Sequence, residues 1–124
     1  MKNGKHVILC VDDDQDVLTS LKLILEKNGY SMVEACTAEE GVRVYRETKP
    51  DLVIVDLMME SVDAGRNFVK ELQLLHNAAP VYMLSSVGDS LVQDVQFSDL
   101  GLTGVLQKPV EVNTLLTMLR RKLV

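Results

Sequence analysis

The chain has 124 residues, of which 47% are hydrophobic, and a net charge of −5. This length and apolar content suit one domain with a sizeable core, so we expect residues 1–124 to form a single domain. The acidic balance argues against direct nucleic-acid binding, because phosphate contacts need clustered Lys and Arg. No apolar run approaches the roughly 18 residues of a membrane span, so we expect a cytoplasmic protein without membrane insertion.

The first half of the chain alternates short apolar runs with amphipathic segments. A strand over about 6–11 is almost continuously apolar, as expected of a strand covered on both faces. A helix over about 15–28 follows, and Gly29 suits the position just after its cap. Strands over about 31–35 and 52–55 flank a second helix, which opens at the capping-box spacing Thr37-Ala38-Glu39-Glu40 and runs to about 48.

The second half of the chain repeats the alternation. Its pattern predicts strands and helices in this order: a helix over about 65–76, a strand over about 81–84, a helix over about 89–100, a strand over about 104–107 and a helix over about 111–123. Five strand–helix units predict an α/β fold, a doubly wound parallel sheet of five strands flanked by five helices. Order 2-1-3-4-5 is one common winding of such a sheet, but periodicity alone does not decide it.

Polar side chains stand where four of the apolar runs end. Asp12 and Asp13 follow the first strand, Asp56 the third, Ser85 the fourth and Lys108 the fifth. Ligands of an open parallel sheet bind at the carboxyl ends of its strands. The placement therefore predicts one reactive cleft that contains all five side chains.

The residue types in this cleft favour metal-assisted phosphoryl chemistry. Three nearby carboxylates repel one another unless a cation intervenes, and their hard oxygens suit Mg²⁺ or Mn²⁺. Asp56 could then act as a nucleophile that forms an acyl phosphate, with Lys108 and Ser85 at the phosphoryl oxygens. Each residue also has a simpler interpretation as a cap, turn or surface residue, and for Asp14 and Asp16 a helix cap is the preferred one.

The motif set resembles the receiver domain of two-component response regulators. The resemblance covers about residues 6–122 and rests on the acidic pair Asp12-Asp13, on Asp56 after its apolar strand, on Ser85 and on Lys108-Pro109. It implies a flavodoxin-like sheet in the order 2-1-3-4-5. It also implies a signalling protein that catalyses only its own phosphorylation and dephosphorylation, and is otherwise not an enzyme.

The resemblance further assigns roles and partners. It implies that Asp13 and Asp56 ligate Mg²⁺ directly, that Asp12 acts through water and that the backbone carbonyl of Met58 is another ligand. Asp56 would accept a phosphoryl group from a histidine kinase or a phosphotransfer protein. Ser85 would couple the site to a downstream target through the face formed by the fourth helix, fifth strand and fifth helix. The expected state is a monomer or a weak phosphorylation-dependent dimer.

Two departures from the family keep other readings open. Glu60 stands where the family usually has proline, and Val105 where it often has an aromatic residue whose rotation reports phosphorylation. A degenerate receiver that binds partners without phosphorylation is therefore one alternative. The other is a phosphohydrolase of the haloacid-dehalogenase type, which would use Asp12 as its nucleophile.

Overall fold

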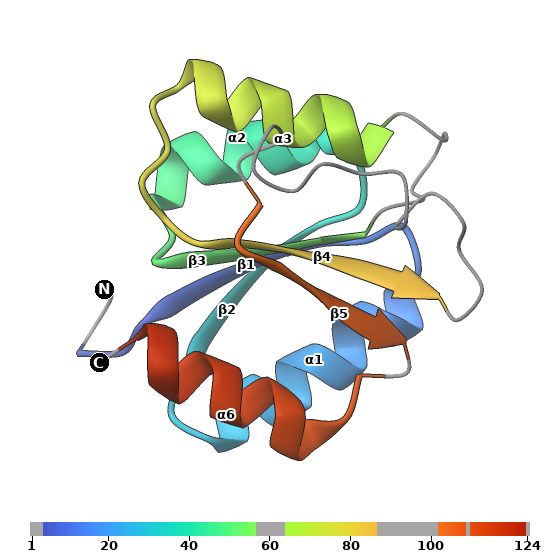
Figure 1. The fold of residues 1–124 in the computed structure, drawn as a ribbon, viewed down its shortest axis with the longest axis vertical. Helices are drawn as coiled ribbons and strands as arrows, with labels where there is room; N and C mark the ends of the chain where they lie inside the picture. The colour runs from blue at the N-terminus through green and yellow to red at the C-terminus, as the bar shows by residue number, and fades with distance from the viewer. Residues whose placement is uncertain (1–3, 57–63, 87–101, 109, 124) are drawn as a thin grey trace.

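The structure is a computed structural model that describes residues 4–56, 64–86, 102–108 and 110–123. Its sheet has five parallel strands in the order β2-β1-β3-β4-β5, which confirms the expected fold and winding (Figure 1). The strands are β1 (Val7–Val11), β2 (Ser31–Ala35), β3 (Leu52–Asp56), β4 (Val81–Ser86) and β5 (Gly104–Lys108). The helices of the described residues are α1 (Gln15–Lys27), α2 (Ala38–Thr48), α3 (Ala64–Leu74) and α6 (Val112–Lys122). The helix predicted over 89–100 lies outside the described residues.

Helices cover both faces of the sheet, with α1 and α6 on one face and α2 and α3 on the other (Figure 1). Successive strand residues point to opposite faces, so each strand feeds two cores. In β1, Ile8 and Cys10 join the core under α1 and α6, whereas Leu9 and Val11 join the core under α2 and α3. This explains why the central strand β1 is apolar at every position. Cys10 and Cys36 are both free thiols, and Cys10 is buried.

Three helix boundaries follow the capping signals of the sequence. The Asp14 side chain accepts a hydrogen bond from the Asp16 N–H at the start of α1, and the Thr37 side chain accepts one from the Glu40 N–H at the start of α2. Gly29 follows the C-cap of α1 with φ +88°, a conformation that favours glycine. By contrast, the C-cap of α2 is Lys49 in the left-handed conformation at φ 49°. A lysine rarely adopts this conformation, so the sequence does not predict this helix end.

The helix predicted over 65–76 is shorter at its C-terminal end, because α3 stops at Leu74. His76 then adopts φ 58°, and the side chain of Asn77 organises the turn. The Asn77 Oδ1 accepts hydrogen bonds from the Tyr45 hydroxyl at 2.8 Å and from the Ala79 N–H at 3.0 Å. The partner Tyr45 lies on α2, so a tertiary contact helps to set a boundary that local periodicity placed two residues later.

Helices α2 and α3 pack closely at Gly41. A Cβ atom on Gly41 would lie 2.8 Å from Cε1 of Phe68 and 3.1 Å from Cγ2 of Val11, so only glycine fits without a shift of its neighbours. Phe68 is among the largest fully buried side chains. The close approach fixes α2 and α3 side by side over the sheet. Among the described residues, no helix is long and apolar enough to cross a membrane.

Candidate functional site

The strand register places three carboxylates at one end of the sheet. Val11 of β1 pairs with Val55 of β3, so Asp12 and Asp56 occupy the next level of two neighbouring strands. One oxygen from each of Asp12, Asp13 and Asp56 lies within 4.8 Å of the others. Asp12 is fully buried, Asp56 is 6% exposed and Asp13 is exposed. The sheet therefore gathers the three predicted acidic residues into a single cluster with one open side.

Asp12 is held on both of its carboxylate oxygens. Its Oδ1 accepts a hydrogen bond of 2.9 Å from the Asp14 N–H, which shapes the loop that carries Asp13. Its Oδ2 forms a 2.9 Å ion pair with Nζ of Lys108. The backbone N–H of Asp12 donates to the Ala35 carbonyl at 3.1 Å, anchoring the loop to the end of β2. Asp12 is thus an organising group of the site, which its sequence position alone does not reveal.

Lys108, at the end of β5, reaches the acidic cluster across β4. Its Nζ lies 2.9 Å from Oδ2 of Asp12 and 3.4 Å from Oδ2 of Asp56. Burial alone would lower the pKa of Lys108, but the hydrogen bond to Asp12 and the charges of Asp56 and Asp12 outweigh it and raise the pKa above its ordinary value. The ammonium group therefore stays charged and is the counterion of both buried carboxylates.

Ser85 lies between the strands that bear Asp56 and Lys108. It follows Leu84, the register partner of Asp56, and it pairs with Gln107, the residue before Lys108. Ser85 is only 2% exposed. Its position at the same end of the sheet matches the predicted cleft, whereas its contact with a phosphoryl group remains a prediction. Met58, predicted to offer its carbonyl, lies outside the described residues.

The charges of the cluster suit a divalent cation. Within the cluster itself, three carboxylates stand beside the one ammonium group of Lys108, so negative charge is in excess among these four side chains. Two oxygens on one Mg²⁺ ion are separated by at most about 4.2 Å, twice the metal–oxygen distance, so small side-chain rotations would bring the 4.8 Å cluster into range. The side chains that could hold the ion are Asp12, Asp13 and Asp56, of which Asp13 is exposed and the two buried ones also face Lys108.

Comparison with known proteins identifies the family. The family profile described as response regulator receiver domain matches residues 8–120. The chain belongs to this family. Receiver domains are the signalling modules of two-component systems and interact with histidine kinases.

Individual relatives support this assignment. The receiver domain is 39% identical over 108 residues to the transcriptional regulatory protein GlrR of Escherichia coli, covering 87% of the chain and 24% of GlrR. It is 31% identical over 118 residues to the regulatory protein PhoP of Bacillus subtilis, covering 93% of the chain and 48% of PhoP. The chain thus spans between a quarter and a half of these curated relatives.

Solved structures share the whole fold of the receiver domain. The chemotaxis protein CheY4 of Vibrio cholerae superposes with a TM-score of 0.86 at 27% identity, covering 97% of this chain and all of CheY4. A CheY-like receiver domain protein of Methanospirillum hungatei gives a TM-score of 0.85 at 28% identity, with 96% and 94% of the two chains covered. The sheet and its helices are therefore those of an ordinary receiver domain.

A groove beside Lys108 was not predicted from the sequence. It has a volume of about 460 Å³ and runs between α1 and the segment after β5, with Val17, Ile24 and Val110 among its lining residues. Both residues lie at the margin of the buried stripe of α1, which is formed by Leu18, Leu21 and Leu25, and both are only partly buried. Their seven-residue separation at the margin of that stripe is the signal that could have revealed the groove.

Proposed function

We propose that this receiver domain accepts a phosphoryl group on Asp56 in a Mg²⁺-dependent reaction and thereby changes its affinity for a partner protein. The observation that carries the proposal is the pairing of one lysine with two buried carboxylates beside a third, exposed one. An acceptor carboxylate needs cations close to it when a phosphoryl group arrives, and Lys108 already lies 3.4 Å from Asp56.

The proposed transfer has a phosphohistidine of a histidine kinase or a phosphotransfer protein as its donor. An oxygen of Asp56 attacks phosphorus, the bond between phosphorus and the imidazole nitrogen breaks, and the nitrogen leaves with the electron pair. Lys108 and the Ser85 hydroxyl would bind oxygens of the transferred group. Bound Mg²⁺ would neutralise charge on the carboxylates and the phosphoryl oxygens. The same site would later admit the water that hydrolyses the acyl phosphate.

The groove between α1 and the segment after β5 is the surface where the donor would dock. Its floor is mostly apolar, and Lys108 itself lies at its edge. A donor helix with apolar side chains over Val17 and Ile24 would bring its phosphohistidine to the acidic end of the sheet. This position supports a protein donor, because a small molecule would make no use of an adjoining apolar groove.

The surface that would bind the downstream target is a further part of the proposal, and its described elements are β5 and α6. Lys108 ends β5 and Ser85 pairs with that strand, so a change at either residue would reach the neighbouring surface of α6. Val105 lies on β5, partly buried against the core below α3, and it offers no ring that could rotate. Switching without an aromatic residue at this position stays a prediction, as does any role of Glu60, which lies outside the described residues.

The experiment is phosphorylation of the purified chain by acetyl phosphate or its mimicry by beryllofluoride, each with Mg²⁺. We expect one phosphoryl group per chain, localised to Asp56 by mass spectrometry after borohydride reduction, and none in Asp56→Asn. The matched control is Asp16→Asn, which removes an exposed carboxylate of α1 outside the cluster. No modification of the wild-type chain would favour the degenerate, phosphorylation-independent receiver.

The same experiment tests the phosphohydrolase alternative, which predicts modification of Asp12. The geometry weighs against that residue, because its oxygens are bound to the Asp14 N–H and to Lys108 and the side chain is fully buried. A phosphoryl group found on Asp12, together with release of phosphate from added phosphomonoesters, would support the hydrolase and overturn the proposal.

A further inference from the structure

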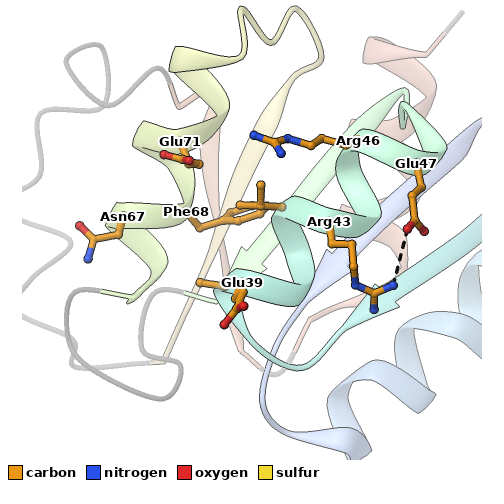
Figure 2. A pocket seen from close by; sticks show the side chains of 9 residues that line it. Glu39, Arg43, Arg46, Glu47, Asn67, Phe68 and Glu71 are labelled. Atoms are coloured by element: carbon orange, nitrogen blue, oxygen red, sulfur yellow. Dashed lines mark ion pairs between the residues drawn. The ribbon is translucent and has the colours of Figure 1, made fainter.

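The largest groove of the described residues lies away from the acidic cluster, between α2 and α3. Its volume is about 680 Å³, and Ala38, Val42 and Phe68 give it an apolar lining (Figure 2). The contact of Gly41 with Phe68 holds the two helices together at the bottom of the groove. The phospho-acceptor chemistry proposed above makes no use of this surface.

The exposed stripe of α2 along this groove is ordered by charge. Glu39 stands at one end, Arg43 in the middle and Arg46 at the other end (Figure 2). Val42 lies on the same helix face by its three- and four-residue spacing from Glu39 and Arg46. Arg43 is paired with Glu47 at 3.6 Å. Within the described part of the chain, neither Glu39 nor Arg46 forms an ion pair. The stripe therefore offers one acidic end and one basic end.

This arrangement is complementary to itself when one copy is turned end to end. Glu39 and Arg46 lie equally far along α2 from the midpoint between residues 42 and 43. A two-fold axis through that midpoint therefore sets Glu39 of each copy beside Arg46 of the other. The same operation brings the two Val42 side chains together over the apolar lining. Closed symmetric dimers use one self-complementary patch in this way.

We propose that the α2–α3 groove is a homodimer interface in which α2 of a second copy packs antiparallel along α2. Each α2 would lie in the groove of the other copy, so that α2 and α3 of both copies form a four-helix arrangement. Arg46 points across the groove towards the α3 side, which carries Glu71 (Figure 2). A guanidinium group has five donors and can bind Glu71 of its own copy and Glu39 of the second copy together.

A second copy is favoured over a purely basic or purely acidic partner, because a second copy offers Arg46 to the acidic end of the stripe and Glu39 to its basic end. The buried apolar patch is small, which places the dimer in the weak class, with a dissociation constant of roughly 10–100 µM. The interface lies on the opposite face of the sheet from α1 and α6 (Figure 1). Dimerisation by this surface should therefore be independent of phosphorylation at Asp56.

The test is sedimentation velocity of unphosphorylated protein in EDTA over a concentration series. The variants are Glu39→Arg, Arg46→Glu and the double variant. In a symmetric dimer each single change turns two attractive pairs into two repulsive ones. We therefore expect each single variant to have a dissociation constant at least about tenfold higher than that of the wild type. The double variant exchanges the charges and restores association to near the wild-type value.

The matched control exchanges Lys22 and Glu26 on α1, which are exposed and lie on the other face of the sheet. Lys22→Glu, Glu26→Arg and their double variant should leave association unchanged. A wild-type chain that stays monomeric throughout the series overturns the proposal. Association that survives both single changes on α2, or that the double variant fails to restore, overturns it as well. The Asp56→Asn variant should dimerise like the wild type, which separates this result from the fate of the proposed phosphorylation.

Discussion

Replacement of Lys108 by methionine should destabilise the metal-free protein, because it leaves two buried carboxylates without their counterion. At an effective dielectric constant of about 20, unit charges 2.9 and 3.4 Å apart attract by about 6 and 5 kcal/mol, and in bulk water by about 1.4 and 1.2 kcal/mol. Lys108 keeps 21% exposure, so screening is substantial, and its own desolvation offsets part of the attraction. We expect a net loss of about 2–3 kcal/mol in the free energy of unfolding.

Urea unfolding and thermal melts followed by circular dichroism measure this loss. In EDTA the melting temperature of Lys108→Met should fall by about 8–12 °C for a domain of this size. Added Mg²⁺ should raise the melting temperature of the variant more than that of the wild type, because the wild-type lysine already neutralises part of the cluster. Lys70→Met, which removes an exposed lysine of α3, is the control. Equal stability of the two variants in EDTA would refute the reasoning.

Three further predictions concern stability. Gly41→Ala should lower the free energy of unfolding by about 1–2 kcal/mol, although alanine has the better helix propensity, because the new methyl group meets Phe68 at 2.8 Å. In a Phe68→Leu background, urea unfolding should show that the same substitution lowers the free energy of unfolding by less. Burial alone would raise the pKa of Asp51, but the 2.7 Å hydrogen bond from the Val7 N–H helps to lower it. Asp51→Asn should therefore lower the free energy of unfolding by about 1–2 kcal/mol at neutral pH. Thermal melts at falling pH should show the stability difference between the wild type and Asp51→Asn vanish as wild-type Asp51 protonates below about pH 4. Because the folded-state pKa of Lys108 is raised, its contribution to the free energy of unfolding should be complete below about pH 10.4 and be lost as pH rises further. Between about pH 9 and 12, the free energy of unfolding should therefore fall more steeply with pH for the wild type than for Lys108→Met.

The strands and the core were predictable because their signals are local. Continuous apolar runs such as 7–11 and 52–55 have few alternatives to a strand covered on both faces. The polar residues directly after them could be assigned to one end of the sheet, since parallel strands all end on the same side. The strand order, by contrast, came with the resemblance to the family and was then confirmed by the register.

The features that the sequence did not predict depend on contacts between distant residues. The end of α3 is fixed with the help of Asn77, which binds Tyr45 of another helix. The ion pair between Lys108 and Oδ2 of Asp12 requires the lysine to reach past β4 and β3, and no local pattern encodes that distance. The groove beside Lys108 arises where α1 meets the chain after β5. Such contacts become visible only when the elements are assembled.

The central position of β1 has a consequence for how the protein assembles during synthesis. β1 is made first and lies between β2 and β3, so this part of the sheet can form once Asp56 has left the ribosome. Asp12, Asp13 and Asp56 would then already be gathered, while Lys108 belongs to the last strand to be made. If β1, β2 and β3 pair before β5 is made, the three carboxylates gather without Lys108, and cations of the surrounding solution would then serve as their counterions until β5 docks.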